Sequence, residues 1–153
     1  MVGICLRNER FHLVQEYLNF KTLYVRLQQC MGSSSSSTTL MMMKTSEVME
    51  HLLGILEGLE LLHSYGFLHP GLSTKKVLLT NKGICKLYDF CLDKDAGSIT
   101  DLKKSQMQTC GMNQFAPEAL HQDEYTKASD VWSTAVVIWE IISETCKCMN
   151  AGN

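Results

Sequence analysis

The sequence predicts an α+β fold, because short apolar runs alternate with two longer stretches of helical periodicity. Residues 46–65 place apolar side chains at the spacing of one helical face, and residues 128–143 repeat that spacing. Short apolar runs bounded by polar turn residues predict strands at 2–6, 11–17, 77–79 and 85–88. With 153 residues and 45% hydrophobic content, the chain is large enough for one domain with a sizeable core.

The N-terminal part is expected to open with a small antiparallel hairpin. Its two strands, at 2–6 and 11–17, flank a short polar sequence. Residues 22–31 are compatible with a short helix. The Gly, Ser and Thr run at 32–39 is typical of a flexible connector, and the methionines at 41–43 are expected to pack against the start of the next helix.

A long amphipathic helix is expected at 46–65. Its apolar residues recur at the spacing that lines one helical face: Val48, Leu52, Leu53, Ile55, Leu56, Leu59 and Leu62. Gly66 follows as a stop signal, because glycine commonly ends helices.

The second half of the chain is expected to hold a hairpin, a polar loop and a last helix. Strands at 77–79 and 85–88 are joined by residues 80–83, in which Asn and Gly favour a hairpin turn. A polar loop punctuated by glycine is expected from Asp93 to Asn113. The helix at 128–143 has core spacing at Trp132, Val136, Val137 and Ile141.

Composition and charge argue against several classes of function. Fourteen basic and sixteen acidic residues give a formal net charge of −2, which disfavours nucleic acid and anionic membranes as partners. The seven cysteines, odd in number and irregularly spaced, do not form a secreted disulfide framework, and Cys146 with Cys148 lacks a second pair at zinc-site spacing. The longest apolar run, 135–139, is far shorter than a membrane span, and residues 1–6 do not look like a signal peptide.

Four separated motifs, in this order, resemble the protein kinase superfamily. They correspond to the kinase motifs His-Arg-Asp, Asp-Phe-Gly and Ala-Pro-Glu and to the start of the central helix of the C-terminal lobe: Phe67-Leu68-His69, Asp89-Phe90-Cys91, Ala116-Pro117-Glu118 and Ser129-Asp130-Val131-Trp132-Ser133. Residues 1–5, 13–18 and 138–141 are similar to tyrosine kinase segments. The resemblance therefore indicates a tyrosine-kinase-like domain.

This resemblance implies a partial kinase fold. Residues 1–18 correspond to the last N-lobe strands and the hinge, and residues 19–153 to the first, mainly helical half of the C-lobe, with a Ser-rich insert at 32–39. The Gly-rich loop, the Val-Ala-Ile-Lys lysine and its glutamate partner lie upstream of the Met1 position in kinases, and further helices follow the Ser143 position. We therefore expect a fragment, a truncated isoform or a partial gene model.

The resemblance also implies degenerate phosphoryl-transfer machinery. In the loop that begins at His69, Gly71 stands in place of the catalytic aspartate that accepts the substrate proton. Lys76 replaces the asparagine that binds a second Mg²⁺, and an ammonium group cannot ligate a metal. Asp89 is then either the remaining Mg²⁺ ligand or a loop carboxylate paired with Lys76. No catalytic residue is expected in this loop, and Pro70 replaces the arginine that would receive an activation-loop phosphate.

ATP and Mg²⁺ are expected to bind weakly if they bind at all. By resemblance, adenine would lie against Leu78 and hydrogen-bond the hinge backbone, with Gln15 at the gatekeeper position before Glu16, Tyr17 and Leu18. Lys76 pointing at the phosphates would favour nucleotide binding without metal. Cys91 replaces the glycine after Phe90 and is read either as a buried thiol or as a reactive one.

Other residues match architectural positions of the family. His69, Phe90 and Met1 correspond to a stack of side chains that links the two lobes, and Asp130 to the aspartate that holds the backbone of the His69 loop. Glu118 is expected to lack its usual arginine partner. Residues 132–142 are expected to expose apolar surface and make the isolated chain sticky.

Three hypotheses about function remain open. The first is a catalytically impaired, pseudokinase-type domain that acts as a signalling scaffold or allosteric partner, with protein partners such as an active kinase. The second is a weak or atypical ATP-dependent protein tyrosine kinase that uses Asp89 with one metal ion. The third is a non-functional truncated product. In each case we expect a cytoplasmic location, free or as the cytoplasmic part of a membrane-anchored protein, without nucleic acid or membrane contact by this segment.

Overall fold

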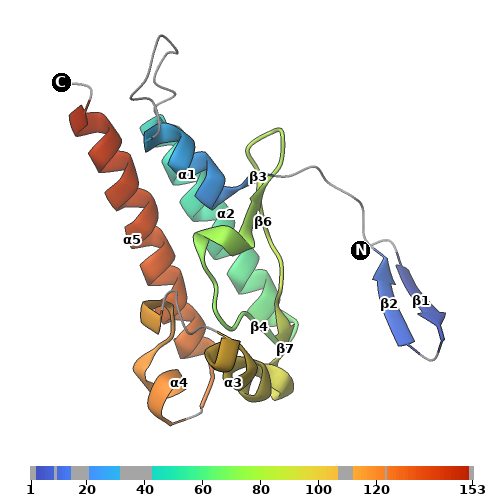
Figure 1. Cartoon of the computed structure of the whole chain (residues 1–153). Coiled ribbons are helices and arrows are strands. Elements are labelled where there is room, and N and C mark those ends of the chain that lie inside the picture. The colour runs from blue at the N-terminus through green and yellow to red at the C-terminus, as the bar shows by residue number, and fades with distance from the viewer. Residues whose placement is uncertain are drawn as a thin grey trace.

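The computed structural model describes residues 3–8, 10–14, 21–31, 43–106, 112–122 and 124–151. It contains helices and small antiparallel sheets, which confirms the α+β class (Figure 1). The longest helix, α5 (Lys127–Ala151), runs alongside α1 (Leu23–Met31) and α2 (Thr45–Ser64). No helix in these ranges is long and apolar enough to cross a membrane.

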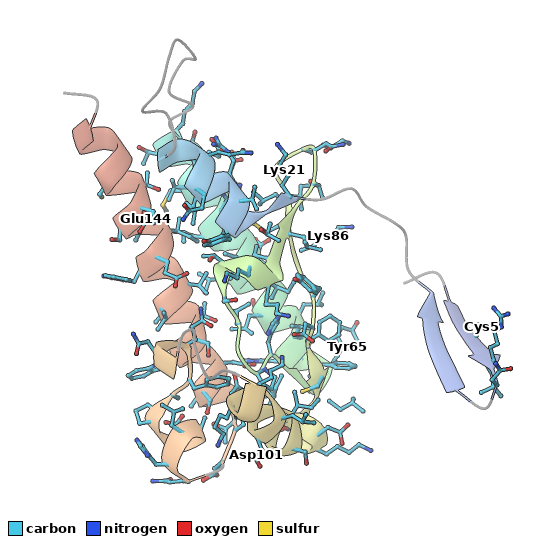
Figure 2. The ribbon with its side chains drawn as sticks, in the orientation of Figure 1. Cys5, Lys21, Tyr65, Lys86, Asp101 and Glu144 are labelled. Carbon is cyan, nitrogen blue, oxygen red and sulfur yellow. The ribbon has the colours of Figure 1, made fainter. Side chains whose placement is uncertain are left out.

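The predicted N-terminal hairpin is present as β1 (Gly3–Arg7) and β2 (Arg10–Val14), paired from Gly3 opposite Val14 to Arg7 opposite Arg10. Asn8 lies in the turn with a positive φ of 51°, which asparagine tolerates better than most residues. Figure 1 shows the hairpin apart from the helices, and Cys5 is exposed on it (Figure 2). The expected continuation of the second strand to Tyr17 lies outside the described residues.

Helix α2 confirms the predicted long helix, but not all of its predicted buried face. Val48, His51, Ile55 and Leu59 are its buried residues. Leu53 and Leu56 are 54% and 44% exposed, so the prediction that they line the core is wrong. At 100° per residue Leu53 points well away from the stripe that contains Ile55, and the simple apolar pattern did not resolve that difference.

The small sheets lie against α2 and place the loops that follow them. The predicted hairpin is confirmed as β5 (Val77–Leu79) and β6 (Cys85–Leu87), with β3 (Lys21–Thr22) on the other side of β5. Gly54 and Gly58 allow β6 to approach α2, since a Cβ at either position would lie 3.3 Å from side-chain atoms of Cys85 or Leu87.

A two-stranded sheet joins two loops that are distant in sequence. It pairs β4 (Phe67–Leu68) with β7 (Cys91–Leu92), and Leu68 lies opposite Cys91. The loop that begins at His69 leaves the end of β4, and Asp89 and Phe90 lead into β7. The pairing therefore sets the two loops side by side.

The polar loop predicted from Asp93 to Asn113 is wrong over much of its length, because this segment contains a helix. A short 3₁₀ turn, η2 (Asp93–Asp95), leads into α3 (Ala96–Gln106), and η3 (Met112–Gln114) follows residues 107–111, which lie outside the described ranges. Ala96 and Thr100 are buried one turn apart, and Lys103 and Lys104 lie in the last turn, where the helix dipole favours cations. Among residues 96–104, whose burial the structure describes, only two small side chains are fully buried, so the sequence of α3 carries little apolar periodicity.

Helix α5 extends further than the predicted helix, and Val137 and Ile141 are buried as predicted, but Trp132 is not. Its buried residues include Ser133, Thr134, Val137 and Ile141. Trp132 is 45% exposed, and its indole N–H donates to the Asn113 carbonyl at 3.2 Å, so its predicted place in the core is wrong. Small polar residues allow close packing that a hydrophobic pattern overlooks, because Ser133 and Thr134 donate hydrogen bonds to the preceding turn of the helix.

The core forms two clusters of buried side chains. The larger joins α1, α2, β5 and α5 and includes Leu23, Ile55, Leu72, Val77 and Val137. Met43 belongs to it, which confirms the expected packing before α2, whereas residues 41 and 42 lie outside the described residues. The smaller cluster supports the loops around α4 (Pro117–His121) and contains Leu68, Ala96, Phe115, Ala116, Ala119 and Tyr125.

Candidate functional site

The candidate site is formed by the His69 loop and by Asp89, which β4 and β7 bring together. The loop turns back on itself through a hydrogen bond from Leu72 N–H to the His69 carbonyl at 3.2 Å. A 3₁₀ turn, η1 (Thr74–Lys76), then leads into β5. The structure thus brings His69, Gly71, Lys76 and Asp89 into one region.

Asp130, at the start of α5, is a fully buried hydrogen-bond centre below this loop. Each of its carboxylate oxygens accepts a hydrogen bond from His69 N–H at 3.0 Å. The Tyr125 hydroxyl donates to it at 2.6 Å, and the His63 ring nitrogen Nε2 lies 2.8 Å away. These contacts confirm that Asp130 holds the backbone of the His69 loop. Burial and the adjacent carboxylate raise the pKa of Tyr125, so its hydroxyl stays protonated.

The rings of His69 and Phe90 differ in how deeply they are buried. The His69 ring is fully buried, and that burial lowers its pKa, so it is neutral at pH 7. Phe90 is 42% exposed, and its ring packs edge-on against Phe67 with centroids 5.5 Å apart. Phe90 is therefore in contact with Phe67, and the expected stack of His69, Phe90 and Met1 stays a prediction because Met1 lies outside the described residues.

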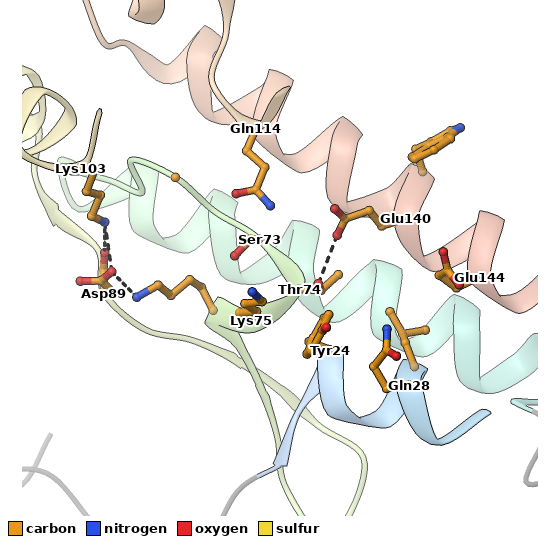
Figure 3. A pocket seen from close by; sticks show the side chains of 14 residues that line it. Tyr24, Gln28, Ser73, Thr74, Lys75, Asp89, Lys103, Gln114, Glu140 and Glu144 are labelled. Atoms are coloured by element: carbon orange, nitrogen blue, oxygen red, sulfur yellow. Dashed lines mark hydrogen bonds and ion pairs between the residues drawn. The ribbon is translucent and has the colours of Figure 1, made fainter. Parts of the chain in front are cut away.

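The Asp89 carboxylate is held by two lysines. Its Oδ2 atom lies 2.7 Å from Lys76 Nζ and 3.0 Å from Lys103 Nζ (Figure 3). Partial burial would raise the pKa of Asp89, but the hydrogen bonds and positive charges of the two lysines outweigh burial and lower it. The pairing with Lys76 is one of the two alternatives that the sequence left open.

Lys103 is the functional residue that the sequence analysis missed. Its Nζ atom also donates to the Pro70 carbonyl at 2.7 Å, so this lysine connects α3 with both loops. Two buried small residues one turn apart, followed by lysines in the last turn, are a weak signal for the helix. Nothing in the sequence pattern indicates the contact with Asp89.

Gly71 adopts a left-handed backbone conformation next to Phe115 and Lys103. Its φ is +76°, in the left-handed region where residues with a Cβ are strained. A Cβ at this position would lie 3.4 Å from Phe115 Cζ and 3.7 Å from Lys103 Cδ. These are ordinary contact distances, so it is the positive φ, which Asp89 shares at 70°, and not the space, that favours glycine at 71.

A cavity of about 730 Å³ opens beside the two loops. Lys103, Asp89 and Lys76 lie at one end of it, and Glu140 and Glu144 of α5 at the other (Figure 3). Thr74 also lines the cavity, and its hydroxyl donates to Glu140 Oε2 at 3.1 Å. The cavity therefore presents a lysine-rich end and a carboxylate end.

Only part of the predicted nucleotide site falls in the described ranges. Leu78 is half-buried on β5, where it pairs with Thr22 and Lys86. The predicted hinge residues lie outside the described residues: Gln15, Glu16, Tyr17 and Leu18. The adenine contacts proposed for them stay predictions.

Two further expectations concern Glu118 and Cys91. Glu118 is not left without a partner, because it accepts a hydrogen bond from the Ser129 hydroxyl at 2.9 Å. Cys91 is a half-buried free thiol, and burial raises its pKa to about 11, which favours the unreactive of its two interpretations. Among the described side chains, no group of three or more His, Cys, Asp or Glu could hold a metal ion.

A buried aspartate under a His-containing loop, an Asp-Phe pair on the adjacent strand and an Ala-Pro-Glu helix together define a protein kinase C-lobe. A family model described as protein tyrosine and serine/threonine kinase matches residues 1–151, and the chain belongs to this family. Fibroblast growth factor receptor 1 of Pleurodeles waltl is 29% identical over 149 residues. The aligned part covers 94% of this chain and 18% of that receptor, so the chain spans less than a fifth of this relative.

These comparisons confirm the tyrosine-kinase-like resemblance and the partial kinase fold. The predicted boundary between the lobes, at residues 18 and 19, lies outside the described residues and stays a prediction. Members of this family typically use ATP with Mg²⁺. The residues around Asp89 do not fit a metal ion, because two ammonium groups already contact the oxygen that would ligate it and Lys76 supplies no oxygen donor.

Proposed function

We propose that the chain is a catalytically impaired kinase domain that acts by binding other proteins and not by transferring phosphate. The observation that carries this proposal is the Asp89 carboxylate, whose Oδ2 is within 3.0 Å of both Lys76 Nζ and Lys103 Nζ. The same region offers no carboxylate at Gly71. The proton acceptor and the metal site of phosphoryl transfer are thus lost together.

The electrostatics of the cluster support this proposal. Mg²⁺ needs several oxygen ligands in octahedral geometry, and a nearby ammonium group both repels it and competes for the same carboxylate. Lys76 and Lys103 carry two positive charges against the one negative charge of Asp89. A divalent cation at this position would face net repulsion.

The architecture around the site supports a role in binding. Asp130 still orders the His69 loop through His69 N–H and Tyr125, although Gly71 in that loop offers no carboxylate for the chemistry. A fold preserved around degenerate chemistry is suited to present a surface. We propose a signalling scaffold or allosteric module in the cytoplasm, with an active kinase as the class of partner.

A phosphorylation assay tests the proposal. Purified chain is incubated with radiolabelled ATP, Mg²⁺ and a tyrosine-containing peptide, next to an active tyrosine kinase domain as positive control. We expect no label above that of the Asp89→Ala variant, since each 1.36 kcal/mol of lost transition-state stabilisation lowers a rate about tenfold. Label incorporated by the wild-type chain and lost in Asp89→Ala would refute the proposal and favour the weak kinase.

Nucleotide binding is tested separately by thermal shift with ATP, with and without Mg²⁺. We expect no shift that depends on Mg²⁺. A shift with ATP alone that disappears in Lys76→Met would assign a phosphate-binding role to Lys76 and keep the impaired-kinase proposal. A shift that requires Mg²⁺ would contradict the proposal. The same melting curves show whether the chain unfolds cooperatively, which a non-functional product need not do.

A further inference from the structure

Lys103 connects three separate segments of the structure through one ammonium group. It belongs to the last turn of α3, it donates to Asp89 Oδ2 at 3.0 Å in the loop before β7, and it donates to the Pro70 carbonyl at 2.7 Å in the His69 loop. Its side chain is only 20% exposed, which is low for a lysine. Figure 3 shows it reaching down to Asp89 at one end of the cavity.

The two lysines at Asp89 differ in what they hold together. Lys76 is the last residue of η1 and lies in the loop next to Asp89. Its ion pair with Asp89 therefore stays within the site. Lys103 comes from a helix whose fully buried docking residues, Ala96 and Thr100, lie in its first half. The second half of α3 reaches the two loops through Lys103.

The position of Lys103 also matches the missing catalytic side chain. A Cβ added at Gly71 would lie 3.7 Å from Lys103 Cδ, so the lysine stem runs beside the space into which an aspartate there would project. The ammonium group at the end of that stem neutralises Asp89. One side chain from α3 therefore adjoins the place of the base and, with Lys76, supplies positive charge at Asp89.

We infer that Lys103 is an internal cation that takes the place of a metal ion at Asp89 and fastens α3 to the His69 loop. This inference rests on the proposed function, because it assigns Asp89 a role other than metal binding. A divalent cation can reach Asp89 only when Lys103 leaves, and the departure of Lys103 also breaks its hydrogen bond to the Pro70 carbonyl, which loosens the second half of α3. The position of α3 and the state of the cleft are therefore coupled.

The first arm of the test measures how strongly α3 is held. Lys103→Met keeps the length and helix propensity of the side chain and removes its charge, and Lys104→Met is the matched control one residue away. By amide hydrogen exchange, we expect residues 100–106 to exchange about tenfold faster in Lys103→Met than in the wild type or in Lys104→Met. Lys103→Arg, which keeps the charge, should restore most of the protection. Equal exchange in all four proteins would overturn the inference.

The second arm measures access of a metal ion to Asp89. Lys76→Asn supplies an oxygen ligand next to Asp89 and leaves Lys103 in place, and Lys76→Asn/Lys103→Met removes both lysines. Mn²⁺ alone is added, and paramagnetic broadening of the amide signals of residues 88–92 is recorded by NMR. We expect broadening in the double variant and none in Lys76→Asn or in Lys76→Asn/Lys104→Met. Broadening in Lys76→Asn alone, or in none of the variants, would overturn the inference.

The two arms separate this inference from the proposed function. Failure of the proposed function appears as peptide labelling by the wild-type chain, whatever the behaviour of α3. Failure of the inference appears as unchanged exchange or as metal access that does not depend on Lys103, with no labelling. Circular dichroism of each variant verifies that it is folded, and Lys103→Arg keeps the exchange arm decisive if Lys103→Met unfolds.

Discussion

Asp130 and Asp89 both adjoin the His69 loop and are stabilised in different ways. Asp130 is fully buried and receives short hydrogen bonds from a backbone N–H, a tyrosine and a histidine. Asp89 is 39% exposed and is matched only by the ends of two flexible lysines. The molecule has kept the carboxylate that orders the loop and has neutralised the carboxylate that would serve chemistry.

This difference has a clear energetic meaning. Removing a buried carboxylate leaves its donors without partners in a region that water does not reach, and such losses are large. An exposed ion pair is screened by solvent and contributes little to the free energy of unfolding. Stability measurements on the two aspartates should therefore diverge strongly.

The largest effect is expected for Asp130→Ala. It leaves the His69 N–H unsatisfied in the core and removes the nearer of the two acceptors of the Tyr125 hydroxyl, so we expect a loss of about 3 to 5 kcal/mol in the free energy of unfolding, measured by urea denaturation. Asp101→Ala is the control, because Asp101 is exposed on α3 and pairs with Lys104 within the same helix at 3.1 Å (Figure 2). A loss below about 1 kcal/mol for Asp130→Ala would break the comparison.

A smaller effect is expected for Tyr125→Phe. The ring stays in the core and only the hydroxyl that donates to Asp130 at 2.6 Å is removed. Because hydrogen bonds to charged groups are stronger than neutral ones, we expect a loss of about 2 kcal/mol in the same assay. Tyr65→Phe, at a position that is highly exposed after α2 (Figure 2), should change nothing measurable. Equal effects at both positions would mean that the buried network contributes little.

A pH dependence is expected from His51 in the core face of α2. Its pKa is lowered chiefly by burial, with Arg26 adding to the shift and Glu47 opposing it. The unfolded chain then binds the proton more readily, so this contribution to stability is complete above about pH 6.5 and declines as the pH falls toward the lowered pKa.

Thermal melts between pH 5 and 8 test this expectation for His51. In His51→Leu the free energy of unfolding should fall less steeply at acid pH, by at most the slope that one bound proton contributes. His121→Leu, on the surface, should match the wild type. The buried His69 contributes with the same sign in all three proteins. Identical pH profiles for wild type and His51→Leu would contradict the assignment.

The smallest effect is expected for Asp89→Asn. Its two ion pairs are partly exposed, so we expect a change of less than about 1 kcal/mol in the free energy of unfolding. The measurement is urea denaturation at low and at high salt, because screening should reduce even this small difference. A loss as large as that of Asp130→Ala would show that the lysine cluster is part of the structural core.

The sequence was sufficient for features that depend on local patterns or on motif positions. Helix α2, the β5–β6 hairpin and the contact of Asp130 with the His69 loop were predicted, because periodicity, turn residues and motif order carry that information. Helix α3 was missed, since Ala96 and Thr100 are small and give almost no apolar signal. Trp132 was misplaced because the buried face of α5 uses Ser133 and Thr134, whose hydroxyls bond within the helix.

The site itself was only half predictable. Gly71 and Lys76 could be found by comparing motifs, because they differ from the residues that kinases have at these positions. Lys103 could not be found in this way. Its contact with Asp89 joins a helix to a loop, and only tertiary packing brings the two together. A long cation has no periodic or spacing signature that identifies its partner.

The left-handed backbone at residue 71 bears on how such a domain can evolve. An aspartate there would place a Cβ in contact with an aromatic ring and a lysine stem, in a backbone region that Asp89 also occupies. Any gain in reactivity would also require changes at positions 76 and 103 in the same lineage. Under the proposed function, recovery of the reaction would thus need several changes together, and descendants of this domain are expected to diversify in what they bind.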